Sequence, residues 1–413
     1  WMGATIGAAI AGSCLALSLS YQDGIYWFVG GVDLALSFVF YPFGVLQFIF
    51  LNLIGEFAFE NELLPTPVKI LGVVIIFRRF IDLAFYGKAV KLIKIRPVIW
   101  ASLFVLSLGL SISASQDISE SLLSLSTYGQ LLIMFLLIID FMRSERELHC
   151  LFIVLVLSGL INAGFAIYQF YFENLARVEG VTGNANRFGI IQVILFCLIA
   201  PVVGSLSVRR LVPAALLTLG LIAYTILLSF SRGASVTAVA VLLYYVLFLR
   251  FGSIRLKAAV VAVIVASLVL TPEGFYDRIA TIPAALSGTR LPHEGSIPTR
   301  FLYYRAGIQM GLDHPFIGVG LGQFNRHIAT YTNLRTVKAM GAHNMYISIF
   351  AEAGSIGFIT FLGFLVTSFL TARRHHWPRL PGTRFKRAFA NSVELGNAAL
   401  LIGGLFATLE YSK

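Results

Sequence analysis

Charged residues are scarce in this chain. Only 12% of its 413 residues are Asp, Glu, Lys or Arg, whereas 58% are hydrophobic and the mean hydropathy is +0.84. A soluble domain of this length could not bury so much apolar surface, so a soluble globular fold is excluded. Apolar runs of roughly 18 to 22 residues, separated by short polar segments, indicate membrane-spanning helices rather than the strands of a β-barrel.

Cysteine is also rare, and the common cofactor motifs are missing. Cys14, Cys150 and Cys197 lie in or beside apolar runs without C-x-x-C spacing, so the sequence indicates neither a disulfide framework nor a metal site. No G-x-x-x-x-G-K-[ST], D-x-D or H-E-x-x-H motif occurs. ATP-driven transport and a metal-held diphosphate therefore have no support, and we predict no metal and no cofactor.

Acidic residues are outnumbered, with 20 Asp and Glu against 31 Lys and Arg, for a formal net charge of +11. The basic residues gather at the ends of apolar runs and form no aromatic-interleaved motif, so we predict no nucleic-acid partner. They mark instead the cytoplasmic ends of the helices. These basic clusters fall within residues 78–96, 143–146, 209–210, 250–257 and 373–387.

The apolar pattern predicts an all-α polytopic membrane protein with about 12 transmembrane helices in one integrated membrane domain. We expect N-terminal helices over 1–271, a long outer loop over 272–343 and C-terminal helices over 344–413. The segment 2–21 is predicted to be a first span rather than a cleaved signal. Residues 25–55 fit either one long tilted helix or two short ones that break at Tyr41-Pro42. The other candidate spans are 67–86, 97–114, 121–142, 148–171, 188–206, 211–230, 233–250, 255–271, 344–371 and 389–409.

The loop before residue 343 is too long, at about 70 residues, to be a mere connection, and loops of that length are usually functional or disordered. The loop is basic although it is predicted to lie on the outer side of the membrane. Long loops are exempt from the rule that basic residues stay on the cytoplasmic side. Within this loop, Arg300 to Gly311 is predicted to form a short amphipathic helix, with Phe301, Tyr304 and Ile308 at helical spacing. A glycine-rich turn over 318–322 follows.

Three predicted helices enter the membrane from the outer side with polar first residues. One begins at Asn184 to Arg187, the second at Ser231-Arg232 and the third at His343-Asn344. Free backbone N–H groups at such starts attract anions, and a guanidinium can bind phosphate through two hydrogen bonds. If Arg300 or Arg305 folds down from the long loop, several arginines converge on a pocket for a phosphorylated or pyrophosphorylated lipid.

Each of these residues also has a structural interpretation. An arginine at a membrane boundary commonly snorkels to lipid head groups, and an interfacial histidine can be purely structural. As a catalytic group, His343 suits a general base, because imidazole accepts a proton near neutral pH. Glu352 lies on the opposite face of the same helix and about 13 Å deeper, so we expect it to tie this helix to a neighbour. Asp82 and Asp140 are predicted to pair within the basic clusters.

Several motifs occur in an order that resembles one known family. They are Arg300-Phe-Leu-Tyr-Tyr304, His314-Pro315 with Gly318-Val-Gly-Leu-Gly322, His343-Asn344 with Glu352-Ala-Gly354, and upstream Ser231-Arg232-Gly233. Together they resemble the O-antigen ligase and polymerase superfamily from about residue 183 to 371. Tyr304 departs from the pattern, because relatives often carry tryptophan there.

The resemblance implies a metal-independent, inverting glycosyltransferase with a GT-C-like fold, acting on the periplasmic face of the bacterial inner membrane. The donor would be an O-antigen glycan on undecaprenyl pyrophosphate and the acceptor a sugar hydroxyl of lipid A-core. By the same likeness His343 is the general base, and Arg187, Arg232 and Arg300 hold the pyrophosphate. Tyr304 and Asn344 would contact substrate, and Arg305 is a weaker candidate.

Other functions stay open on the sequence. An O-antigen polymerase or a protein O-oligosaccharyltransferase would use the same lipid-linked donor, and the basic loop favours the ligase because it suits a phosphorylated acceptor. A transporter or lipid flippase would show inverted repeats and broken helices in mid-membrane that carry paired charges. Neither feature is evident in the sequence.

Overall fold

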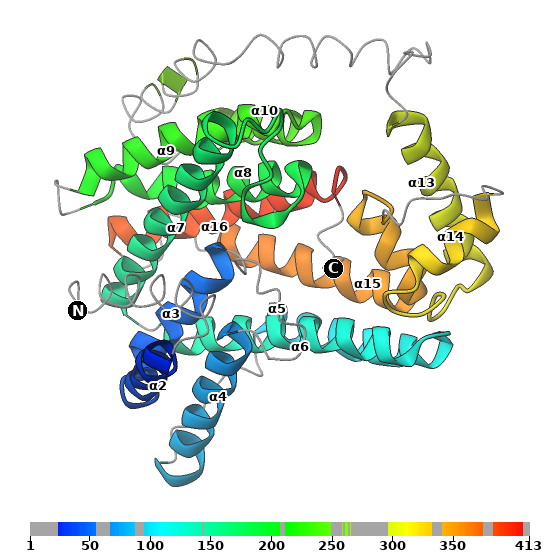
Figure 1. Ribbon diagram of the computed structural model, residues 1–413, viewed down its shortest axis with the longest axis horizontal. Coiled ribbons are helices and arrows are strands. Elements are labelled where there is room, and N and C mark those ends of the chain that lie inside the picture. The colour runs from blue at the N-terminus through cyan, green and yellow to red at the C-terminus, as the bar shows by residue number, and fades with distance from the viewer. Residues whose placement is uncertain are drawn as a thin grey trace.

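The computed structural model describes residues 24–54, 67–86, 95–142, 144–206, 211–248, 296–332, 341–374 and 383–407, with the isolated positions 258, 261, 262 and 265. All regular elements in these ranges are helical (Figure 1). The spans predicted at 2–21 and 255–271 lie outside the described residues, apart from those isolated positions. The all-α prediction is confirmed for the described part of the chain.

The helices follow the apolar runs closely, and α4 has the predicted bounds. In chain order they are α2 (Gly24–Val39), α3 (Tyr41–Ile54), α4 (Pro67–Tyr86), α5 (Arg96–Ser111), η2 (Ile112–Ala114), α6 (Ile118–Phe141), α7 (Glu145–Tyr171), η3 (Gly180–Thr182), α8 (Ala185–Val203), α9 (Leu211–Leu228), α10 (Arg232–Phe248), α13 (Ser296–Asp313), α14 (Phe324–Thr332), α15 (Met345–Arg374) and α16 (Arg384–Gly403).

Six of the described helices are long and apolar enough to cross a membrane, which fits a multi-pass membrane protein. They are α5 with its 3₁₀ extension, α6, α7, α8, α9 and α15. α3 has only 14 residues, so its length of roughly 21 Å falls short of a hydrocarbon core of about 30 Å. Most of α3 is buried, and its apolar sequence reflects burial within the protein. The predicted count of about 12 spans is therefore not confirmed.

The structure shows where the helices begin and end in two of the predicted segments. Residues 25–55 form two helices, because the first ends at Val39 and the second begins at Tyr41 with Pro42 in its first turn. The last helix covers 384–403 instead of 389–409. Its earlier start has a local cause: the Thr383 side chain accepts a hydrogen bond from the Lys386 N–H at 3.3 Å. Its earlier end follows from the pair Gly403-Gly404, which leads into a turn.

Small residues bring the helices around the candidate site into close contact, as is common in membrane proteins. α5 packs along α15, where Gly363 leaves room for the ring of Trp100. α8 packs along α16, where Gly403 lies against Ile190. A side chain at either glycine would overlap its neighbour, since its Cβ would lie 2.2 Å from Trp100 or 2.6 Å from Ile190.

α15 was predicted as one continuous helix, but it breaks at Gly354, where φ is +63° and ψ is −162°. The backbone N–H groups released by the break are bound by a neighbouring loop. Ser355 N donates to Pro315 O at 2.8 Å, and Ile356 N donates to Phe316 O at 3.3 Å. The break is therefore filled by protein backbone and carries no paired charges of the kind a transporter site would need.

The glycine-rich segment forms the predicted turn, with positive φ at Gly318, Gly320 and Gly322. Glu352 fixes this turn to α15. Its carboxylate accepts hydrogen bonds from Gly322 N at 2.9 Å and from Phe324 N, the first residue of α14, at 3.0 Å. The prediction that Glu352 ties its helix to a neighbour is thus confirmed, and the neighbour is the start of α14.

The two membrane aspartates pair as predicted. Asp82 accepts a hydrogen bond from Arg78 at 2.6 Å, and Asp140 forms an ion pair with Arg79, with 2.6 Å between Oδ2 and Nε. At the other end of the bundle, α14 lies beside the hairpin between α5 and α6, where Arg326 pairs with Asp117, and α13 packs against α14 and α15 (Figure 1). Ser121 of α6 donates to Leu321 O there at 2.6 Å. The two short helices of the long loop are thereby fixed at the end of the bundle where α15 begins.

Candidate active site

The start of α8 is held by a side-chain cap. The Asn184 side chain accepts hydrogen bonds from the N–H groups of Asn186 at 3.0 Å and Arg187 at 3.2 Å. The preceding turn is fixed by Gln169 of α7, whose side-chain oxygen accepts from Gly180 N at 2.8 Å. These contacts place the half-buried Arg187 on the first turn of α8.

The start of α10 lies directly against α8. The Ser231 hydroxyl accepts from Ala234 N at 3.3 Å, so it caps the helix that Arg232 begins. Gly189 of α8 packs onto this turn so closely that an added Cβ would lie 2.7 Å from the Cβ of Ala234. Arg187 and Arg232, both half-buried, therefore occupy the first turns of two helices in contact.

The start of α15 is capped by Asn344, whose side-chain oxygen accepts from Tyr346 N at 3.0 Å and Ile347 N at 3.1 Å. The two adjoining N–H groups are also used, because Met345 N donates to Gly404 O and Ser348 N to Asn344 O. This corrects the expectation of free N–H groups: on α15 all four are occupied. An anion near this helix start must be held by side chains.

The turn after α16, residues 403–407, joins the elements that carry the predicted site. The carbonyl oxygen of Leu405 accepts from the Asn344 side chain at 3.3 Å and lies 3.5 Å from the Tyr304 hydroxyl of α13. Phe406 packs against Gly233, with 2.5 Å between its Cβ and the Cβ that a side chain at 233 would add. α10, α13 and α15 thus meet at this turn, and α8 joins them through α10 and through Gly403.

His343 has an unusual backbone and an unusual electrostatic environment. Its φ is +51°, in the left-handed region that only a few per cent of residues other than glycine adopt. Burial and the nearby positive charge of Arg300 lower its pKa from 6.5 to about 4. The imidazole is therefore neutral at pH 7 and free to accept a proton, and Arg300 lies near enough to act on it.

Removing the positive charge of Arg300 should raise the pKa of His343. We expect Arg300→Gln to move it from about 4 towards 6.5, stopping short because burial still lowers it. The sign for activity follows, since a base must be unprotonated: transfer by wild-type protein should fall only as pH approaches 4, whereas transfer by the variant should begin to fall at a higher pH. The pH dependence of kcat/KM for the donor, measured from pH 7 to about 4, reports the pKa of the free protein and tests the shift, and parallel profiles would contradict it.

Arg305 is not brought to the other predicted residues. On α13, Tyr303, Ala306 and Met310 are buried against the neighbouring helices. Arg305 is exposed on another face, together with Phe301.

Sequence reasoning missed three groups in this region. Arg177, in the connection after α7, donates to Ser229 O and to the Asn186 side chain, each at 3.3 Å, and so links the starts of α8 and α10. The sequence could have pointed to Arg177 because it lies on the side predicted to be outer, where arginine is otherwise sparse. Gln169 and the Leu405 carbonyl gave none, because the first looks like any buried amide and the second is backbone.

Metal ligands do not gather in the described ranges, where no group of three or more His, Cys, Asp or Glu side chains could share an ion. Residues 217–362 match a family model described as O-antigen ligase. This match covers α10, α13, α14 and the first part of α15, and so includes Arg232, Arg300 and His343. The search of curated proteins found no match.

Proposed function

We propose that the chain is an O-antigen ligase of the O-antigen ligase and polymerase superfamily, because residues 217–362 match a family model of that description. It transfers an O-antigen glycan from undecaprenyl pyrophosphate to a sugar hydroxyl of lipid A-core, without a metal and with inversion. The active site faces the periplasm from the inner membrane, and the described helices embed in membrane lipid.

One observation carries the proposal. The first turns of α8, α10 and α15 and the helix α13, which are far apart in the sequence, meet at the turn 403–407. These elements carry Arg187, Arg232, His343 and Arg300 respectively. A neutral imidazole beside fixed positive charges is the combination that glycan transfer from a pyrophosphate requires, because one group takes a proton while others stabilise the departing anion.

The reaction is a single displacement at the anomeric carbon. The acceptor hydroxyl gives its proton to His343 as its oxygen bonds to the anomeric carbon. The bond from that carbon to the pyrophosphate oxygen breaks, and undecaprenyl pyrophosphate leaves with the bonding electrons. Attack opposite the leaving group inverts the anomeric centre. Arg187, Arg232 and Arg300 stabilise the charge that develops on the leaving oxygen.

Donor binding strengthens the base. In the free protein burial and, to a smaller extent, the charge of Arg300 hold the pKa of His343 low, at about 4. A bound pyrophosphate places negative charge beside Arg300 and offsets its effect, so the pKa of His343 rises towards neutrality. The base therefore becomes effective when donor is present, and the acceptor hydroxyl is activated only where it can react.

Asn344 and Tyr304 hold this arrangement together. Both polar atoms of the Asn344 side chain make hydrogen bonds within the protein. The oxygen accepts from Tyr346 N of α15, and the nitrogen donates to Leu405 O. We assign it a positioning role next to His343 rather than the substrate contact expected from the sequence. Tyr304 lies one helical turn after Arg300, and its ring is half-buried beside Leu405, where a sugar can stack on its open face.

Purified protein in nanodiscs tests the assignment directly. It is given lipid-linked O-antigen together with lipid A-core, with a second lipid-linked glycan, or with a pilin protein, and products are weighed by mass spectrometry. A glycan-sized mass gain on lipid A-core is expected. Elongation of the lipid-linked glycan alone would identify a polymerase, and modified pilin an O-oligosaccharyltransferase, and either result would overturn the ligase proposal.

A further inference from the structure

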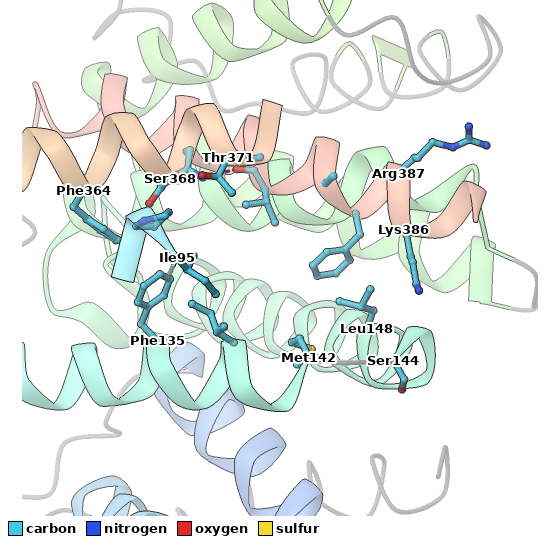
Figure 2. Close-up of a pocket in the computed structure, with 17 residues that line it drawn as sticks. Ile95, Phe135, Met142, Ser144, Leu148, Phe364, Ser368, Thr371, Lys386 and Arg387 are labelled. Carbon is cyan, nitrogen blue, oxygen red and sulfur yellow. Dashed lines mark hydrogen bonds between the residues drawn. The ribbon is translucent and has the colours of Figure 1, made fainter. Parts of the chain in front are cut away.

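A cavity lies at the end of α15 opposite to His343. Its volume is about 610 Å³, and it is bounded by the last turns of α6 and α15 and the first turns of α5, α7 and α16 (Figure 2). Ser368 on its wall lies roughly 35 Å along α15 from His343, so this cavity cannot belong to the site described above.

Most of the cavity wall is apolar. The ring of Phe135 on α6 lies edge-on to that of Phe364 on α15, with 5.6 Å between the ring centroids (Figure 2). Ile139, Leu148 and Phe389 add further apolar side chains to the wall. A cavity of this size holds a drug-sized molecule or part of a lipid chain. Its walls are suited to a hydrocarbon chain.

The open end of the cavity is positively charged. Lys386 points from α16 towards α7, and Arg387 lies beside it with its guanidinium turned outward (Figure 2). Among the described residues, neither has an acidic side chain within ion-pair distance. The nearby Glu147 of α7 is engaged, because it accepts from Ser144 N in a capping box. Lys386 and Arg387 line the cavity, whereas neither Glu147 nor Glu145, the other acidic residue in the first turn of α7, does so.

Two further features favour an anion at the same place. The first turn of α16 contains no acidic residue and carries Lys386 and Arg387 at the positive end of the helix dipole, an arrangement that a bound anion would stabilise. In addition, the Nε of Arg387 is buried and makes no hydrogen bond within the described part of the chain. Buried polar atoms of this kind usually have a partner.

We propose that this cavity binds an anionic glycerophospholipid from the leaflet at the basic ends of the helices. One acyl chain occupies the apolar part between α6 and α15. The phosphate lies at the mouth, where Lys386 and Arg387 supply the opposite charge. A zwitterionic phospholipid fits the same walls but carries no net charge for these cations to attract.

Lipid binding by the purified full-length protein tests the proposal. Delipidated protein is titrated with phosphatidylglycerol or phosphatidylcholine and bound lipid is counted by native mass spectrometry. A basic residue near the anionic head group contributes about 1 kcal/mol, which is about fivefold in affinity. We expect phosphatidylglycerol to bind more tightly, Lys386→Gln to weaken it about fivefold, and phosphatidylcholine binding to stay unchanged in that variant.

Two variants complete the experiment. Lys69→Gln makes the same charge change on the exposed surface of α4 and should bind both lipids as wild-type protein does. Ala390→Phe narrows the cavity and should lose binding of both. Equal affinity for the two lipids in wild-type protein, or an unchanged affinity for phosphatidylglycerol in Lys386→Gln, would overturn the proposal, as would equal weakening by Lys69→Gln.

Discussion

Replacing His343 with alanine is expected to slow glycan transfer by about 10²- to 10⁴-fold, the usual contribution of a general base. Donor binding should change little, because the pyrophosphate is held by arginines on α8, α10 and α13. Transfer rates at saturating donor, combined with a separate donor-binding titration, distinguish a lost base from a lost binding site.

Backbone strain must be separated from lost chemistry in this experiment. His343 has a φ of +51°, which alanine tolerates poorly and asparagine well. His343→Asn therefore keeps the local backbone while removing the base, and it should be as slow as His343→Ala. His314→Ala removes an exposed histidine before the glycine-rich turn and should leave the rate unchanged. Wild-type transfer by His343→Asn would refute the assignment.

Apolar run length was sufficient to predict most helices but not their breaks. α4 and α6 were predicted closely because each is a long apolar run bounded by polar residues. The break at Gly354 was missed, since its cause is tertiary: a side chain there would overlap the backbone of Phe316, with only 2.4 Å between its Cβ and the carbonyl carbon. A glycine within an apolar run gives no sign of which distant segment approaches it.

In the candidate site too, the sequence predicts the local features but not the contacts between distant segments. Asn184, Ser231 and Asn344 precede apolar runs, so the local sequence indicates three helix starts on one side. What joins them is the turn 403–407, in which the contacts come from a backbone carbonyl and an aromatic ring without any catalytic signature. The predicted end of the last helix, at 409, also concealed this turn. Convergence in space is a property of packing that the residues of one segment cannot reveal.

Replacing Glu352 with alanine is expected to strongly destabilise the end of the protein where α13, α14 and the start of α15 pack together. The carboxylate is buried and accepts hydrogen bonds from Gly322 N and Phe324 N, so the variant leaves one buried and one half-buried donor without this partner. Each such donor costs about 1–3 kcal/mol. We expect a lower melting temperature in detergent and faster protease cleavage within residues 314–332. Glu173→Ala, which removes an exposed carboxylate, should change neither measurement.

The same substitution should reach the candidate site through α13. The ring of Phe324 and the side chain of Ile347 both contact α13 at Gly307, where an added Cβ would lie 2.9 and 2.5 Å from them. If α14 loosens, α13 loses one side of this contact and Arg300 moves away from His343. Arg300 then lowers the pKa of His343 less, so transfer by Glu352→Ala should begin to fall at a higher pH than transfer by wild-type protein, as it does for Arg300→Gln. Glu352→Gln keeps one acceptor oxygen but places an amide donor opposite the other N–H group, and it should fall between wild type and Glu352→Ala. A stable Glu352→Ala protein with the wild-type pH profile would show that the turn does not position Arg300.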